Sequence, residues 1–333
     1  MLERLDELVK WSVKNKEWLF SGAGISIIGI ISFVLKKIFN TNKNDNIKSI
    51  NINYNNNNFP QKSSQSNNEQ KDDINNDMLK LVDRFISVYT NHGILVNQIC
   101  FYINPDFQLK LSDFKDKDSI LQILDDKIIN WTCKMFNVQR EWIDGKSNRI
   151  YASIDYYKRI TVCIKKLVEL KNLYNEDLEI YFIKNGDLNP NVFGKSYVII
   201  IFKYAINKFN NSPIYKYIPI KTMWDWGHWR SRYQLKSIIY FCEKLGLNIN
   251  GYDMPLDVIE NISMGIVFPE LEIDKIPINI WYPEDYIDYE TENVEAKEVQ
   301  ETDSIMQYIK DEGYLKYFYK IQQDEKNIIL MEN

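Results

Sequence analysis

The peptide at residues 223–233, Met-Trp-Asp-Trp-Gly-His-Trp-Arg-Ser-Arg-Tyr, has the residue types best suited to binding another molecule. An arginine in this peptide could hold a carboxylate or a phosphate, and a tryptophan face could stack on a planar or cationic group. The alternative role is structural: Asp225 caps the helix that follows, and the tryptophans brace that helix against a sheet. The predicted ligand-binding residues are Trp224, Trp226, His228, Trp229, Arg230 and Arg232.

Catalysis is not predicted from these residue types. His92 and His228 are the only histidines, and neither has an obvious serine or cysteine partner that would form a nucleophilic pair. The cysteines are far apart in the sequence and lie in apolar helical patterns, which is typical of reduced, buried thiols. We therefore expect a protein that is not an enzyme, with no catalytic residue, no metal site and no cofactor. The cysteines are Cys100, Cys133, Cys163 and Cys242.

Residues 149–286, which contain this peptide, predict a small mixed α/β unit. Their periodicity gives the element order α-β-β-β-α-β, which predicts a mixed sheet with helices on one or both faces. The expected helices cover residues 156–173 and 234–245, and the expected strands cover 178–184, 196–202, 215–221 and 247–251.

This element order is also the core order of the PD-(D/E)xK nuclease fold, whose chemistry needs particular residues. Metal-dependent hydrolysis requires carboxylates that converge on the centre of the sheet, with a lysine nearby. The run 197–202 contains no acidic residue, and the run 215–221 contains no E-x-K pattern. The sequence therefore argues against an active nuclease of this type.

Residues 77–148 predict an all-helical unit. The segment 133–145, Cys-Lys-Met-Phe-Asn-Val-Gln-Arg-Glu-Trp-Ile-Asp-Gly, resembles the C-terminal end of Cro/C1 (lambda-repressor-like) helix-turn-helix domains. His92-Gly93-Ile94 resembles the entry to the second helix of that family. The resemblance is carried by hydrophobic framework positions and implies a degenerate helix-turn-helix fold for this unit.

The charge of this unit argues against DNA binding. The recognition helix of the family would lie near residues 104–118, where three lysines are offset by four aspartates. Over residues 77–148, nine basic and ten acidic residues leave a net charge of −1, and the whole chain carries −5. Phosphate binding needs clustered lysines and arginines. We therefore expect this unit to bind a protein rather than nucleic acid.

Residues 18–35 form a run of eighteen residues without a charge, followed by Lys36 and Lys37. A transmembrane helix needs about 20 apolar residues, so the sequence predicts a single-pass span over 18–39, in contact with the lipid bilayer. The soluble region is then expected on the cytoplasmic side of the cell membrane. A signal peptide or a buried helix is the alternative. The small residues Gly22, Ser26 and Gly29 share one helical face, which would allow the spans to pack as a homo-oligomer.

The remaining segments are expected to be a short amphipathic stretch, two linkers and a tail. Residues 40–76 are rich in asparagine and serine and predict a disordered linker. Residues 287–303 are rich in acidic residues and predict a solvated acidic linker. The amphipathic stretch is 1–17, and a C-terminal helix with its tail is 304–333.

The predicted fold class is a single-pass membrane anchor plus an α+β soluble region, with an all-α helix-turn-helix-like unit before the mixed α/β unit. The predicted function is a membrane-tethered, non-enzymatic sensor or adaptor that binds an unknown protein or a small ligand, in a bacterial stress or phage-defence system. The alternatives are a membrane-bound DNA-binding transcription regulator and an oligomerising membrane effector.

Overall fold

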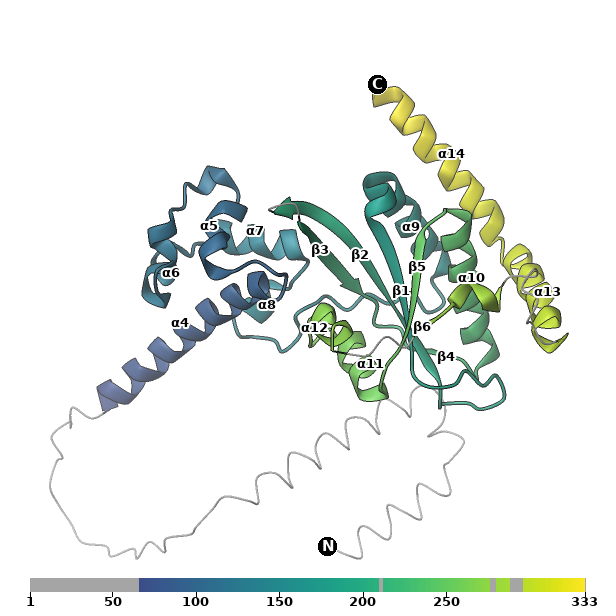
Figure 1. The fold of residues 1–333 in the computed structure, drawn as a ribbon, viewed down its shortest axis with the longest axis horizontal. Helices are drawn as coiled ribbons and strands as arrows, with labels where there is room; N and C mark the ends of the chain where they lie inside the picture. Colours follow the sequence, from purple (N-terminus) through teal and green to yellow (C-terminus); the bar gives the residue numbers. More distant parts are fainter. Residues whose placement is uncertain (1–65, 210–211, 276–279, 288–295, 333) are drawn as a thin grey trace, which may run out of the picture. The chain divides into compact units, whose positions relative to one another are not determined.

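A mixed six-stranded sheet is the centre of the fold. The computed structural model describes residues 66–209, 212–275, 280–287 and 296–332. The strand order is β3-β2-β1-β5-β6, and the short β4 pairs with β2 (Figure 1). The strands are β1 Leu178–Lys184, β2 Tyr197–Phe209, β3 Ser212–Pro219, β4 Trp224–Asp225, β5 Asn248–Asp253 and β6 Ile280–Trp281.

The pairing within the sheet follows the order of the elements along the chain. The strands β1, β2 and β3 form an antiparallel meander, whereas β5 is parallel to β1. A parallel neighbour requires a crossover connection, and the chain makes it through a helix. The predicted mixed sheet is therefore present, with the observed order α9-β1-β2-β3-β4-α10-β5.

Helices precede, interrupt and follow the sheet. The N-terminal helices are α4 Ser66–Thr90, α5 Ile99–Tyr102, α6 Lys117–Ile123, α7 Asp126–Phe136 and α8 Arg140–Ile143, with 3-10 turns η1 Val96–Gln98, η2 Pro105–Phe107 and η3 Leu111–Phe114. The later ones are α9 Ile160–Tyr174, η4 Asn175–Asp177, α10 Trp229–Lys244, α11 Leu256–Ser263, α12 Pro269–Ile273, η5 Pro283–Tyr286, α13 Ala296–Asp311 and α14 Tyr314–Glu332.

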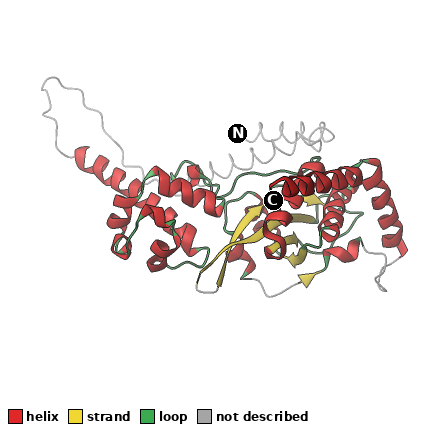
Figure 2. Ribbon diagram, turned by 90° about the horizontal axis from the view of Figure 1, so that it is seen from above, coloured by secondary structure: helices red, strands yellow, loops and turns green. Residues whose placement is uncertain are grey.

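Each face of the sheet is buried by its own group of helices. Successive side chains of a strand point to opposite faces, so Phe182 and Ile183 belong to different cores. Phe182 packs with the face covered by α9, α10, α13 and α14. Ile183 packs with the opposite face, which shares one core with α4 to α8, α11 and α12. Figure 2 shows strands with helices on either side.

The helical region 77–148 shares a core with the sheet. Phe85 of α4 and Phe136 of α7 are fully buried in the same cluster as Tyr217 of β3. The side chain of Asn137 donates a hydrogen bond to the backbone carbonyl of Tyr217, at 3.2 Å. The domain boundary predicted at residue 148 remains a prediction, as does the helix-turn-helix resemblance. Residues 104–118 form the turns η2 and η3 and the first residues of α6.

The predicted fold class requires a correction. In the part of the chain that the structure describes, no helix is both long enough and apolar enough to cross a membrane. The described residues form an α/β fold with a mixed sheet, and they do not support the membrane anchor that we predicted as the first part of the fold class. The predicted span 18–39, its packing residues Gly22, Ser26 and Gly29, and the segment 1–17 lie outside the described residues.

Two segments predicted as linkers contain helix. The helix α4 begins at Ser66, inside the predicted linker 40–76, and α13 begins at Ala296, inside the predicted linker 287–303. Both helices continue into amphipathic sequence, so the polar composition of their first turns did not show that they belong to a helix. The C-terminal helix expected at 304–333 is present as α13 and α14, which meet at Gly313.

His92 is a buried titratable group between the N-terminal helices and the sheet. Its ring packs against Phe136 and Phe268, with ring centroids 4.5 and 5.8 Å apart. Burial lowers the pKa of His92 to about 4, although a hydrogen bond with the backbone carbonyl of Val88 opposes this shift. The folded protein therefore keeps this imidazole neutral in mildly acidic solution.

This burial predicts a stability that falls in acid. The unfolded chain takes up a proton on His92 below about pH 6.5, whereas the folded chain does so only near pH 4. Between pH 7 and pH 5 the free energy of unfolding should therefore fall by about 2 kcal/mol because of this group. Urea denaturation at both pH values should show this loss in the natural chain and not in His92→Phe. An equal loss in both chains would contradict the assignment.

Candidate functional site

The structure separates the predicted ligand-binding residues into a buried set and an exposed set. Trp224 and Trp226 are 0% and 2% exposed and belong to the core of the sheet. The ring of Trp226 packs edge-on against Tyr286, with centroids 5.1 Å apart. These two tryptophans brace α10 against the sheet, so their role is structural.

Arg232 is also buried and has protein partners. Its guanidinium lies 2.7 Å from the carboxylate of Glu301, on α13, and donates to the backbone carbonyl of Trp226 at 2.5 Å. The ammonium of Lys236 lies 2.8 Å from the other oxygen of Glu301. Burial opposes ionisation of the Glu301 carboxyl. The charge of Lys236 and the hydrogen bonds from Lys236 and Arg232 outweigh this effect, so the pKa of Glu301 is below its usual value. The cluster Arg232, Lys236 and Glu301 therefore fastens α13 to α10.

His228 begins α10 and forms its N-cap. The backbone N–H of Ser231 donates to Nδ1 of His228 at 3.2 Å, which satisfies one of the free amides at the start of the helix. The expectation that Asp225 would cap this helix is wrong. Its carboxylate instead accepts hydrogen bonds from the backbone N–H groups of Gly194 and Gly227, both at 2.9 Å.

The contact at Gly227 brings the loop between β1 and β2 against the start of α10. A β-carbon on Gly227 would lie 2.2 Å from the carbonyl oxygen of Val192 and 2.7 Å from the α-carbon of Phe193. Only glycine allows the two backbones to approach this closely. Together with Asp225, this contact fixes where the loop presents Val192 and Phe193.

An exposed aromatic patch results, formed by Val192, Phe193, Trp229 and Arg230. The side chains of Phe193 and Trp229 are 62% and 52% exposed, and that of Val192 is 39% exposed. Phe193 lies edge-on to His228, with ring centroids 6.0 Å apart. The guanidinium of Arg230 lies 5.2 Å from the centre of the Trp229 ring. Of the predicted residues, only Trp229 and Arg230 are thus clearly available to a partner, and His228 is half-buried between them and Phe193.

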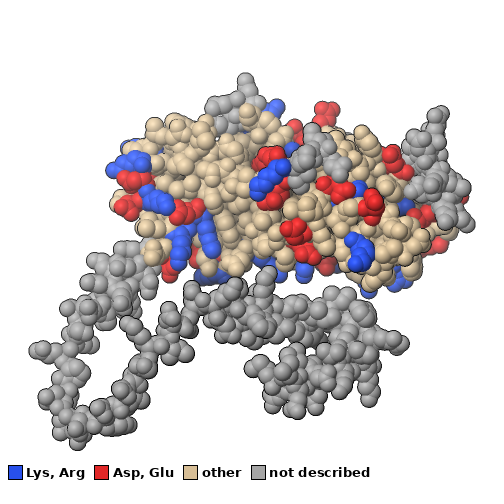
Figure 3. All heavy atoms as spheres, turned by 60° about the horizontal axis from the view of Figure 1, so that its bottom comes forward, with Lys and Arg blue, Asp and Glu red and all other residues tan. Residues whose placement is uncertain are grey.

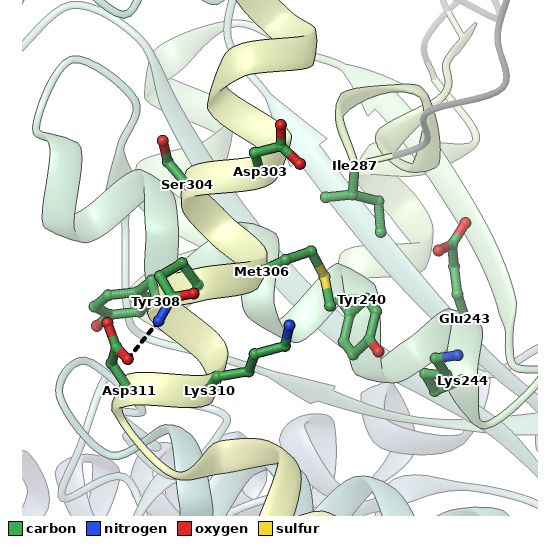
Figure 4. Close-up of a pocket in the computed structure, with 11 residues that line it drawn as sticks. Tyr240, Glu243, Lys244, Ile287, Asp303, Ser304, Met306, Tyr308, Lys310 and Asp311 are labelled. Carbon is green, nitrogen blue, oxygen red and sulfur yellow. Dashed lines mark hydrogen bonds between the residues drawn. The ribbon is translucent and has the colours of Figure 1, made fainter.

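A cavity lies between α10 and α13 (Figure 4). It has a volume of about 1130 Å³ and is lined by both cationic and anionic side chains. Lys310 and Met306 of α13 point toward Tyr240 of α10 across it. Lys244 and Lys310 line it together with Glu243, Asp303 and Asp311, so its charges are mixed, with one more anionic than cationic side chain.

A polar cluster on the sheet was not anticipated from the sequence. The carboxylate of Glu179 on β1 lies 3.4 Å from the ammonium of Lys203 on β2. It also accepts a hydrogen bond from the hydroxyl of Tyr181 at 3.0 Å. The ammonium of Lys203 donates to that same hydroxyl at 2.7 Å and lies 3.9 Å from the ring centre of Tyr215. These groups satisfy one another, so we assign the cluster to the stability of the sheet.

The charges of the described surface are mixed. On the face that Figure 3 shows, lysines and arginines lie beside aspartates and glutamates. Arg140 of α8 illustrates the pattern, because it pairs with both Asp126 and Asp144. Within the described ranges, no group of three or more histidine, cysteine, aspartate or glutamate side chains is arranged to hold a metal ion.

Comparison with known proteins adds no assignment to this site. No family model, no curated protein and no solved structure matches this chain.

Proposed function

We propose that this protein is a non-enzymatic binding module whose aromatic patch docks a protein partner. The observation that carries the proposal is that Phe193 and Trp229 are both more than half exposed, and that Phe193 packs on His228, the residue next to Trp229. Large aromatic side chains and arginine dominate the binding energy of protein interfaces. Isolated exposed apolar residues are common, but here two of them adjoin an arginine on one surface.

The attachment of the patch supports this proposal. Trp224 and Trp226 are buried below it, and Asp225 holds the loop that carries Phe193. A surface fixed in this way loses little conformational freedom when it binds. The buried and the exposed residues of this peptide therefore have complementary roles.

The patch also indicates the chemistry of its partner. Arg230 is exposed and lies over the ring of Trp229. A guanidinium in this position favours a carboxylate that sits next to an apolar side chain. We infer a partner segment that combines an acidic residue with neighbouring apolar residues.

Peptide selection tests this function and requires no identified partner. The full chain is immobilised and used to select from a random peptide library, with counter-selection against a chain that carries Phe193→Ala and Trp229→Ala. The expected result is enrichment of peptides that contain acidic and apolar residues. Selection that yields no peptide preferring the natural chain over the double variant would overturn the proposal.

Charge reversal at Arg230 gives a separate prediction. In Arg230→Glu, the affinity for the selected acidic peptides should fall by about tenfold or more, which corresponds to about 1.4 kcal/mol. The fold should be unaffected because the residue is exposed. Fluorescence anisotropy with a labelled peptide measures the change, and Lys127→Glu, an exposed lysine of α7, is the control. Equal losses in both variants would indicate a general charge effect and contradict the assignment.

A further inference from the structure

A second cavity lies where the N-terminal helices meet the sheet, and the proposed function does not use it. Its volume is about 340 Å³, which lies within the range of small-molecule sites. The lining side chains come from four elements of the chain. They are Trp131, Lys134 and Met135 of α7, Tyr174 of α9, Ile206 of β2 and Lys216 of β3.

The charge of this cavity is of one sign. Its two ionisable cationic residues are Lys134 and Lys216, and no carboxylate lines it. By contrast, the cavity between α10 and α13, the one beside Lys171 and the one beside Trp281 each include an aspartate or a glutamate. The chain as a whole has a net charge of −5, but the charged residues that line this cavity are all lysines. Such a lining favours an anion.

The two lysines are held close together. The ammonium of Lys216 donates a hydrogen bond to the backbone carbonyl of Lys134, at 2.6 Å. Burial lowers the pKa of Lys216, and the nearby charges of Lys166 and Lys134 lower it further. Among the described residues, neither Lys134 nor Lys216 has a carboxylate in ion-pair contact. A bound anion would therefore stabilise the ammonium of Lys216 beside α7, and the side chain of Lys134 lines the same cavity.

The rest of the lining is aromatic or apolar, and its rings are fixed in place. Tyr174 stacks on Tyr204 with ring centroids 4.0 Å apart. Trp131 is held edge-on by Tyr102 and Phe107, each with centroids 6.3 Å from it. Rings held in this way offer a planar ligand a surface that is already formed.

We propose that this cavity binds a nucleoside monophosphate, with the base against Trp131 and Tyr174 and the phosphate between Lys134 and Lys216. Every nucleobase has a π-face that can stack on an aromatic side chain, and lysine is a common phosphate ligand. The bound nucleotide would contact α7 on one side and the β2–β3 hairpin on the other. It would therefore join the N-terminal helices to the sheet and stabilise their association.

Isothermal titration of the full chain tests the proposal with defined probes. The probes are AMP, GMP, CMP and UMP, with adenosine and inorganic phosphate as fragments that carry only one of the two features. At least one monophosphate should bind about tenfold more tightly than either fragment. That nucleotide should also raise the melting temperature of the chain in proportion to its occupancy.

Four variants, one of them a control outside the cavity, test where the nucleotide binds. Lys216→Gln and Trp131→Leu should each weaken the affinity for the nucleotide by about tenfold or more. Lys127→Gln, on the same helix as Lys134 but outside the cavity, should leave it within about twofold. Because Trp131 also packs with Tyr102, the exposed Lys134→Gln provides a further test that does not alter the core. The proposal is overturned if no monophosphate binds more tightly than the fragments. It is also overturned if Lys216→Gln and Lys134→Gln both bind the nucleotide as tightly as the natural chain does.

Discussion

Replacing Glu301 by alanine should lower the free energy of unfolding by about 4 kcal/mol. This carboxylate lies between the guanidinium of Arg232 and the ammonium of Lys236, at 2.7 and 2.8 Å. The side chains of these two cations are only 8% and 1% exposed, so water cannot replace the lost carboxylate. Removing one partner of a buried ionic cluster leaves the remaining charges unpaired, so the loss of stability is large. This loss is much larger than the difference in stability between the intact cluster and a well-packed apolar replacement.

Urea denaturation of the full chain measures this effect, and an exposed ion pair provides the control. Asp77 and Lys80 form such a pair on α4, with side chains 78% and 69% exposed. Asp77→Asn should therefore change the free energy of unfolding by less than about 0.5 kcal/mol. Similar losses for Glu301→Ala and Asp77→Asn would show that the cluster of Arg232, Lys236 and Glu301 does not fasten α13 to α10.

Replacing Gly227 by alanine should cost about 3 kcal/mol of unfolding free energy, because the added methyl group overlaps backbone atoms. The overlap is with the carbonyl group of Val192 and the α-carbon of Phe193, neither of which can move by a simple side-chain rotation. The loop must therefore shift away from the start of α10. The same shift would displace Phe193 from His228 and weaken binding at the aromatic patch.

Gly186 is the control for this glycine, because it lies in the loop between β1 and β2 that Gly227 contacts and has open space around it. A β-carbon on Gly186 would meet nothing within 4 Å, although its φ of +59° is unfavourable for alanine. Gly186→Ala should cost only about 1 kcal/mol, from the left-handed backbone alone. If the two variants unfolded at the same urea concentration, the overlap at Gly227 would have no destabilising effect of its own, which would contradict the prediction.

The regular elements of the α/β region could be predicted because they extend over many residues. The predicted strand 178–184 coincides with β1, and the helix expected at 156–173 corresponds to α9 at Ile160–Tyr174. The strand expected at 196–202 continues to Phe209 because β3 keeps pairing with it beyond a bulge. The two-residue strands β4 and β6 were missed because a period cannot be recognised in two residues.

The roles of the individual aromatic residues could not be predicted in the same way. Composition drew attention to residues 223–233, but it does not distinguish Trp226, which is 2% exposed, from Trp229, which is 52% exposed. That difference arises because Trp226 lies beside β4 whereas Trp229 begins a helix whose other face is buried. Phe193 completes the patch from a separate loop, and the close backbone contact at Gly227 and the hydrogen bond from Gly194 to Asp225 hold that loop there.

The cavity proposed to bind a nucleotide could not be predicted from the sequence either. Trp131 and Lys134 fall in the unit that was expected to be helical, and Lys216 falls in a strand that was expected. Nothing in their spacing indicates that α7 packs beside the β2–β3 hairpin, because that packing depends on contacts between elements far apart in the chain. The signal available was the absence of acidic residues near Lys216 in 212–220, which is too general to identify a site.

The affinity of a selected peptide for the chain with Trp229→Ala tests the central proposal most directly. Titration calorimetry compares this variant with the natural chain and with Phe101→Ala. Phe101 is an aromatic residue of α5 that is 69% exposed and lies outside the patch. The proposal predicts at least about tenfold weaker binding for Trp229→Ala and unchanged binding for Phe101→Ala. Binding that is unaffected by Trp229→Ala would contradict it.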